Sequence, residues 1–178
     1  MMKKMINYVA SLIVLVLLVS CDDGASLQKY YVDNQDNKNF ISLDIPASVL
    51  SLKDNVSPEA EEALASLRKM NVLAFKVNEE NMTEYKAEEQ KVKAILKNKK
   101  FKDLMTIKDK GRNIILKYEG DPESIDEVVV YASDKEQGFA LVRVLGDNME
   151  PAKIMKLANS IADVDSDGFK QLENLIKK

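Results

Sequence analysis

Histidine and tryptophan are absent from this 178-residue chain, and cysteine occurs once, at Cys21. Without an imidazole, the chain lacks the usual general base for a serine or cysteine nucleophile and the usual zinc ligand. A single cysteine also excludes an internal disulfide. Only 6 glycines and 4 prolines are present, which excludes collagen-like chains, whereas 46% hydrophobic and 31% charged residues are typical of a globular domain.

The first twenty residues have the pattern of a secretory signal. Lys3 and Lys4 precede an apolar run of about 14 residues, Ile6 to Val19, and the small residue Ser20 follows it. This run has the length of a signal h-region and is shorter than the ~20 residues that a membrane-spanning helix needs. We therefore predict a signal peptide over residues 1–20 in place of a permanent transmembrane helix.

The residues Leu18-Val19-Ser20-Cys21 resemble a bacterial lipobox, in which the cysteine thiol is diacylglycerylated and the signal is cut before it. Cys21 is then the lipidation site, and residues 21–26 form a polar tether. At ~0.8 kcal/mol for each buried CH₂, two or three acyl chains hold such a protein at a membrane. The alternative is an unmodified cysteine after an ordinary cleavable signal. With either interpretation the mature chain is exported, and a location outside the cytoplasm argues against nucleic acid as a partner.

Residues 27–162 are predicted to form a single domain that begins with helices and short strands. Strands are expected at 40–45 and 71–77, with a helical turn from Pro46 to Leu52. Apolar residues at helical spacing predict helices over 26–35, over 57–70, from Thr83 to about Lys97, and after Pro151.

From residue 101 the apolar pattern becomes extended. Short turns separate four predicted strands, at 104–108, 113–118, 125–132 and 138–145. Connections this short require antiparallel neighbours, because a parallel crossover needs a dozen residues or more. The expected fold is α+β and two-layered: a mainly antiparallel sheet, made of a four-strand meander plus one or two N-terminal strands, with helices packed on one face.

Several segments of the chain resemble the small Bacteroidota lipoproteins called domain of unknown function 4252. Besides the lipobox, the likeness rests on Leu27-Gln28-Lys29-Tyr30-Tyr31, Phe40 to Pro46, Val72–Phe75, Phe101-Lys102-Asp103-Leu104-Met105, and Leu145-Gly146-Asp147 leading into Ile154–Leu157. The resemblance implies lipid attachment in a Gram-negative envelope, and no catalytic residues. In that phylum an acidic stretch after the lipidated cysteine is associated with export to the outer-membrane surface. Asp22-Asp23 fits this in part, which leaves the leaflet undecided.

A basic segment runs from Lys91 to Arg112 and holds nine basic and two acidic residues, although the whole chain has a formal net charge of −3. Such asymmetry suits anionic lipid headgroups, acidic glycans or an acidic protein partner. The alternative, which we favour, is a solvated helix end with two strand edges that lysines protect from pairing. The candidate residues for an anionic partner are Lys91, Lys93, Lys97, Lys99, Lys100 and Lys102.

Residues 163–178 are predicted to form an acidic connector and a short terminal helix, with Phe169, Leu172, Leu175 and Ile176 on one side of that helix. The connector matches the start of an EF-hand calcium loop, with candidate ligands Asp163, Asp165 and Asp167 before Gly168. Lys170 and Asn174 occupy positions where the loop needs an apolar residue and a bidentate Glu. An acidic connector that caps the last helix is therefore the favoured alternative.

We expect a lipid-anchored envelope protein, attached to the outer membrane, whose domain binds a protein or glycan partner without catalysis or a cofactor. Phosphate-loop, dinucleotide and serine-elbow motifs are absent from the sequence. The alternative functions are a hydrolase of glycans that uses carboxylates alone, and a weak calcium-binding module at residues 163–174. A cleft with two carboxyl groups roughly 5–9.5 Å apart would favour the hydrolase.

Overall fold

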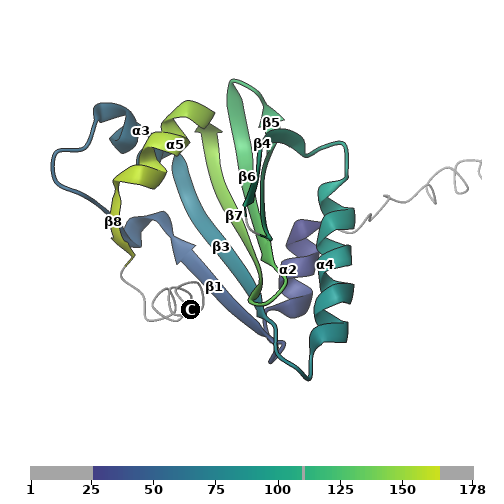
Figure 1. Cartoon of the computed structure of the whole chain (residues 1–178). Helices are drawn as coiled ribbons and strands as arrows, with labels where there is room; N and C mark the ends of the chain where they lie inside the picture. The colour runs from purple at the N-terminus through teal and green to yellow at the C-terminus, as the bar shows by residue number, and fades with distance from the viewer. Residues whose placement is uncertain (1–25, 110, 165–178) are drawn as a thin grey trace, which may run out of the picture.

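The computed structural model describes residues 26–109 and 111–164, and Figure 1 shows how their helices and strands are arranged. A six-stranded sheet forms the centre, in the order β1-β3-β7-β6-β5-β4, and every neighbouring pair is antiparallel. Its strands are β1 (Phe40–Pro46), β3 (Leu67–Lys76), β4 (Lys102–Asp109), β5 (Arg112–Asp121), β6 (Ser124–Asp134) and β7 (Gly138–Met149). The predicted α+β class and the antiparallel sheet are confirmed.

Helices cover both faces of the sheet, which corrects the expectation that they pack on one. Helices α2 (Leu27–Asn34) and α4 (Met82–Leu96) lie on one side, and α3 (Pro58–Ser66) and α5 (Pro151–Ser160) on the other (Figure 1). Strand β3 shows why helices pack on both faces: successive side chains of a strand point to opposite faces of the sheet. Leu73 and Phe75 enter the core under α2 and α4, whereas Val72 and Ala74 enter the core on the other face.

The core under α2 and α4 is built on aromatic side chains. Phe75 stacks on Phe139 with ring centroids 5.7 Å apart, and Phe40 meets both rings edge-on. Tyr85 and Tyr131 close the cluster from α4 and β6. Edge-to-face and offset ring pairs stabilise a core beyond the area they bury. This face is therefore closed to solvent along the helices.

The second core lies under α3 and α5 and contains Ala63, Leu67, Val144 and Leu157. Beside it, β2 (Leu50–Leu52) pairs with β8 (Ile161–Val164) in a separate two-stranded sheet. The predicted turn after Pro46 is a 3₁₀ helix over Ala47–Val49 and then strand β2. Helix α3 ends at Ser66, earlier than predicted, because Leu67 already begins the β3 pairing with β7.

Arg143 and Glu127 form an ion pair inside the protein, on the sheet face that α2 and α4 cover. The guanidinium donates two hydrogen bonds to the carboxylate, from Nε at 2.8 Å and from Nη2 at 3.0 Å. Both side chains are almost fully buried, at 7% and 8% exposure. A bidentate arrangement of this kind is the geometry in which a buried charge pair offsets most of its desolvation cost.

Candidate functional site

Helices α3 and α5 leave one end of their sheet face uncovered, and we call this part the open sheet face. The strand registers place two rows of apolar side chains there. In strand order, one row is Ile41, Ala74, Ala140, Ala132, Ile114 and Ile107, and the other is Leu43, Val72, Val142, Val130, Leu116 and Met105. All six strands contribute to these rows, and neither row contains a charged side chain. Val72, Ala74 and Leu116 are themselves buried within the rows, so the exposed part of the face is formed by the other members.

The open sheet face reaches solvent most fully at its β4 edge. Met105 is 37% exposed and Ile107 is 42% exposed, and both lie on the last strand of the sheet. Val130, Ala132, Ile114 and Val142 are half-buried along the interior strands. Scattered single apolar residues are normal on a protein surface, but a contiguous apolar patch marks an interaction site.

A hollow of about 210 Å³ lies at the end of the open sheet face next to the β6–β7 turn. Its floor is formed by Ala74, Ala132 and Ala140, which lie side by side on three adjacent strands. Ile114 lines one side. The depth follows from side-chain size, since three methyl groups in one row leave space that larger residues would fill.

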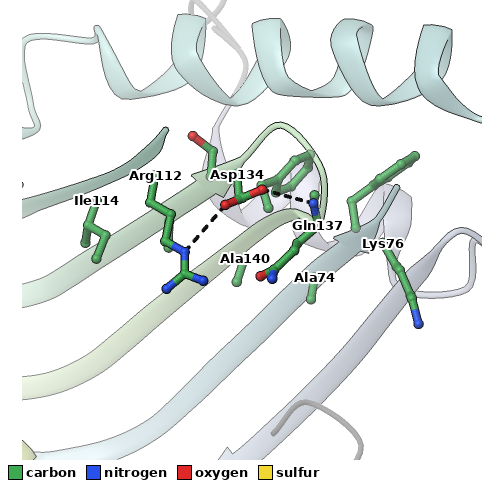
Figure 2. A pocket seen from close by; sticks show the side chains of 12 residues that line it. Ala74, Lys76, Arg112, Ile114, Asp134, Gln137 and Ala140 are labelled. Carbon is green, nitrogen blue, oxygen red and sulfur yellow. Dashed lines mark hydrogen bonds and ion pairs between the residues drawn. The ribbon is translucent and has the colours of Figure 1, made fainter. Parts of the chain in front are cut away.

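Polar groups occur only at the rim of the hollow (Figure 2). Arg112 Nε lies 3.5 Å from Asp134 Oδ2, and the Arg112 side chain is 58% exposed. Asp134 Oδ1 also accepts hydrogen bonds from the backbone N–H groups of Glu136 at 2.8 Å and Gln137 at 3.1 Å. These backbone donors and the Arg112 guanidinium lower the pKa of the Asp134 carboxyl, so it is ionised at neutral pH. The rim thus presents a fixed carboxylate and an accessible guanidinium.

This geometry does not supply the carboxyl pair that a glycan hydrolase would use. Among the residues that line the hollow, Asp134 is the one carboxylate, and it is held by Arg112 and by the turn. The floor offers methyl and methylene groups, which suit an apolar ligand and not a hydroxyl-rich sugar.

Three of the predicted basic candidates, Lys91, Lys93 and Lys100, form ion pairs with carboxylates. Lys91 pairs with Glu88 at 2.6 Å, and Lys93 pairs with Glu89 at 2.7 Å on the same helix. Lys100 reaches Glu119 on β5 at 2.8 Å. These carboxylates neutralise much of the local charge.

Lys97, Lys99 and Lys102 are the remaining candidate lysines of the basic segment. Lys102 donates a hydrogen bond to the Gly120 carbonyl oxygen at 2.8 Å and lies over the Tyr118 ring. Lys97 and Lys99 form no ion pair with the residues that the structure describes. Arg112 lies at the hollow, away from the helix end.

The calcium candidates are placed only in part. Asp163 belongs to strand β8, where its Cα pairs with Ser51, so it does not begin a loop directly after a helix as the EF-hand pattern requires. Asp165 and Asp167 lie outside the described residues, as do Cys21 and the predicted terminal helix. In residues 26–109 and 111–164, no three Asp, Glu, Cys or His side chains gather closely enough to hold a metal ion.

The predicted signal and tether, residues 1–20 and 21–26, lie outside the described chain except for Ser26. The Ser26 hydroxyl accepts a hydrogen bond from the Lys29 backbone N–H at 3.1 Å and caps α2. Within the described part of the chain, no helix is both long and apolar enough to cross a membrane.

The sequence carried a signal for the open sheet face that periodicity alone did not resolve. Ile114-Ile115-Leu116 and Val128-Val129-Val130 are apolar at consecutive positions. A strand with only one buried face alternates apolar and polar residues, whereas a continuous apolar run indicates that both faces are apolar. The runs therefore indicate that both faces of these strands are apolar.

Comparison with known proteins identifies the family of this chain. No curated protein and no solved structure matches the chain. A family model does match, over residues 28–157, which extend from α2 to α5 and include every strand of the large sheet. The chain belongs to the family described as Domain of unknown function (DUF4252).

Proposed function

We propose that this protein is a non-catalytic binding module, anchored in the cell envelope by lipid on Cys21, whose open sheet face binds an apolar segment of a partner protein. The observation that carries the proposal is the contiguous apolar surface across six strands, with Met105 and Ile107 exposed at its edge. Burial of such a surface contributes roughly 25 cal/mol for each Å² removed from water.

The shape of the face favours a protein segment over a glycan. A glycan needs hydrogen-bond partners for its hydroxyl groups, and the two rows of the open sheet face offer none. An amphipathic helix binds through apolar side chains spaced along one side, and a row of alanines between isoleucines accepts such side chains. Arg112 at the rim adds a contact for an acidic residue of the partner.

The position of the tether is compatible with binding of a partner at the open sheet face. Helix α2 follows the tether directly, and it packs on the sheet face opposite to the open one (Figure 1). Six residues span at most ~20 Å when extended. Lipid on Cys21 would therefore hold the α2 side near the membrane and leave the open sheet face available to an envelope partner.

A capture experiment tests the binding proposal. The mature chain with Cys21→Ser is immobilised and exposed to solubilised envelope proteins, in parallel with the Met105→Glu/Ile107→Glu variant. The matched control is Val32→Glu, because Val32 is a 53% exposed apolar residue on α2, outside the open sheet face. We expect a specific partner to bind the parent and the control and to be lost from the double variant. Equal capture by all three proteins would contradict the proposal.

The basic segment is tested in the same experiment. Lys97→Glu/Lys99→Glu reverses the two lysines that form no ion pair with the described residues. Since neither lysine contributes to the two rows of the open sheet face, we expect this variant to retain the partner. Loss of the partner only in this variant would assign binding to an anionic surface instead.

Lipid attachment has its own test. The chain is expressed with its own signal and Cys21, or as a Cys21→Ser variant behind an ordinary cleavable secretory signal, and membranes are washed at high salt before fractions are compared. We expect the parent in the membrane pellet and the variant in the soluble fraction, because the acyl chains of the lipid on Cys21 supply the anchor. A variant that still pelleted after the wash would show that Cys21 is not the anchor.

A further inference from the structure

Strand β4 is an edge of the large sheet, and among the described residues it pairs with β5 alone. Residues 102–108 are all exposed, so no helix or loop of the described chain buries them. Of the five large apolar side chains that are exposed in the described part of the chain, three lie on this strand: Leu104, Met105 and Ile107. An uncovered edge has unpaired backbone groups and is a template for pairing with another strand.

A bulge in β4 decides which of its side chains share a face. The β5 partners of Asp103 and Met105 are consecutive residues, so Leu104 is an extra residue in the ladder. Because of it, Asp103, Thr106 and Lys108 lie on the sheet face of α2 and α4, whereas Met105 lies on the open sheet face. Without the extra residue, Asp103 would lie on the opposite face.

The ladder positions of β4 are complementary to themselves in the antiparallel direction. There are seven, in the order Lys102, Asp103, Met105, Thr106, Ile107, Lys108 and Asp109. The central position is Thr106, which would lie opposite Thr106 of a second copy. Next to it, Met105 would lie opposite Ile107 on the open sheet face. One position further, Asp103 would lie opposite Lys108 on the other face. In these pairs an apolar residue meets an apolar one, and an acid meets a base.

The charges of β4 favour its own copy over an arbitrary strand. Lysines on an edge strand discourage pairing with other chains. In the register centred on Thr106, Lys108 meets the Asp103 carboxylate, and opposite charges directly across a ladder are stabilising. The Asp103 carboxylate lies 2.6 Å from Lys117 Nζ, but its side chain is 80% exposed and has further acceptor sites. Lys102 is held at β5, where its ammonium donates to the Gly120 carbonyl oxygen.

We propose that two copies of this chain associate through β4, with Thr106 on the two-fold axis, so that their sheets form one continuous antiparallel sheet. The same strand contributes on both sides, as a two-fold interface requires. One pair of strands is a small interface, so the association should depend on protein concentration. The pairing does not rest on the proposed function. It would, however, join two open sheet faces into one apolar surface.

A disulfide on the two-fold axis tests the register in the full mature chain. With Cys21→Ser the protein has no cysteine, so Thr106→Cys supplies a single thiol that lies opposite its own copy. The Cα atoms of directly opposite residues are about 4.5–5.5 Å apart, which a disulfide can bridge. We expect oxidation with diamide to produce the covalent dimer about tenfold faster, or more, than in a control with the thiol elsewhere on β4.

The matched control is Lys108→Cys, because residue 108 is also exposed and lies on the same face of the same strand. In the proposed register the two copies of residue 108 are four ladder positions apart. This separation is about 14 Å, which is beyond the reach of a disulfide. Circular dichroism and the urea midpoint show whether each variant is folded. Equal rates in the two folded variants, or a faster reaction at position 108, would overturn the pairing.

Charge reversal tests the same interface without a covalent bond. Lys108→Asp places a carboxylate opposite Asp103 at both symmetric positions. In sedimentation over a concentration series, we expect the dissociation constant of the dimer to rise about tenfold or more, because like charges directly opposite are destabilising. Lys99→Asp makes the same change in net charge outside β4 and should leave the constant at the parent value. A parent that sediments as a monomer at every concentration, or equal effects of the two reversals, would overturn the pairing.

The pairing and the proposed function fail in different ways. Lys108→Asp leaves Met105 and Ile107 on the open sheet face, so this variant should still capture a partner. A second copy captured from the envelope is recognised by its mass and counts as pairing. If capture of another protein depends on Met105 and Ile107 but the disulfide rates are equal, the binding function stands and the pairing is wrong. If Thr106→Cys crosslinks selectively but no other protein is captured, the pairing stands and the binding function is wrong.

Discussion

The buried ion pair of Arg143 and Glu127 allows a prediction about the free energy of unfolding. Removal of one partner should destabilise the fold strongly, whereas removal of both should cost much less. Both side chains are more than nine-tenths buried and are joined by two hydrogen bonds of 2.8 and 3.0 Å. Glu127→Leu leaves a guanidinium inside the protein without its counter-charge. Removal of one partner from a buried pair costs about 3–5 kcal/mol. Arg143→Met likewise leaves the Glu127 carboxylate buried without its counter-charge.

Replacement of both partners together should cost much less. In Arg143→Met/Glu127→Leu, no buried charge remains, and apolar side chains of similar length occupy the space. Such exchanges are often neutral or stabilising by about 1–4 kcal/mol. The double variant should therefore be more stable than either single variant, with a strongly negative interaction energy in the double-mutant cycle.

Urea unfolding measures these differences. With a slope of ~2 kcal/mol/M, typical for a small domain, a loss of 3–5 kcal/mol lowers the midpoint by about 1.5–2.5 M. If the free energy of unfolding has the same dependence on urea concentration in the parent and the variants, the shift in midpoint measures the change in that free energy. Single variants that each lose less than about 1 kcal/mol, or a double variant that loses the sum of both, would refute the reasoning from desolvation.

Three further predictions concern the hollow and the aromatic core. Gly138 has a φ of +118°, and an added Cβ would overlap the Phe75 carbonyl oxygen, so Gly138→Ala should destabilise the fold by about 3 kcal/mol or more in urea unfolding. Asp134 has a lowered pKa, so it contributes stability above its unfolded pKa of about 3.9 that is lost as pH falls through the folded value. Asp134→Asn should therefore be less stable than the parent at pH 7, and the difference should shrink as the pH falls below the unfolded pKa. The Tyr131 hydroxyl is buried without a hydrogen-bond partner among the described residues, so Tyr131→Phe should be neutral or stabilising by up to about 1 kcal/mol.

Each of these predictions has a result that would contradict it. An alanine at position 138 that leaves the midpoint unchanged would mean that β3 and β7 separate there without cost. A stability difference for Asp134→Asn that persists unchanged at low pH would show that ionisation of the carboxyl is not its source. A loss of more than about 1 kcal/mol in Tyr131→Phe would show that the hydroxyl has a partner in the protein.

Local patterns predicted most of the helices and strands, because their signals are close in sequence. Helix α2 lies within the predicted range 26–35, with Ser26 as its N-cap, and α3 begins at Pro58 inside the predicted range 57–70. The predicted helix over 57–70 is longer than α3, which ends at Ser66. Helical spacing of apolar residues continues to Leu67, but the pairing of β3 with β7 begins at that residue. Here tertiary contacts override a local preference.

Features that depend on distant pairing could not be predicted. Strand β8 exists because Ile161–Val164 meets Leu50–Leu52, more than a hundred residues earlier. The ion pair of Lys100 with Glu119 likewise requires the β4–β5 register. The open sheet face needs the registers of all six strands, since only together do they place Ala74, Ala140 and Ala132 in one row.

The binding role of the open sheet face is tested most directly in intact cells. A photo-crosslinking residue replaces Ile107 on the face or, as control, Val32 on α2, both exposed apolar positions. Short-range crosslinking reports what touches each position while the protein is in its own envelope. We predict a discrete crosslinked partner from position 107 and none from position 32, with the adduct lost when Met105→Glu is added. The same products from both positions, or no adduct from position 107, would contradict the account.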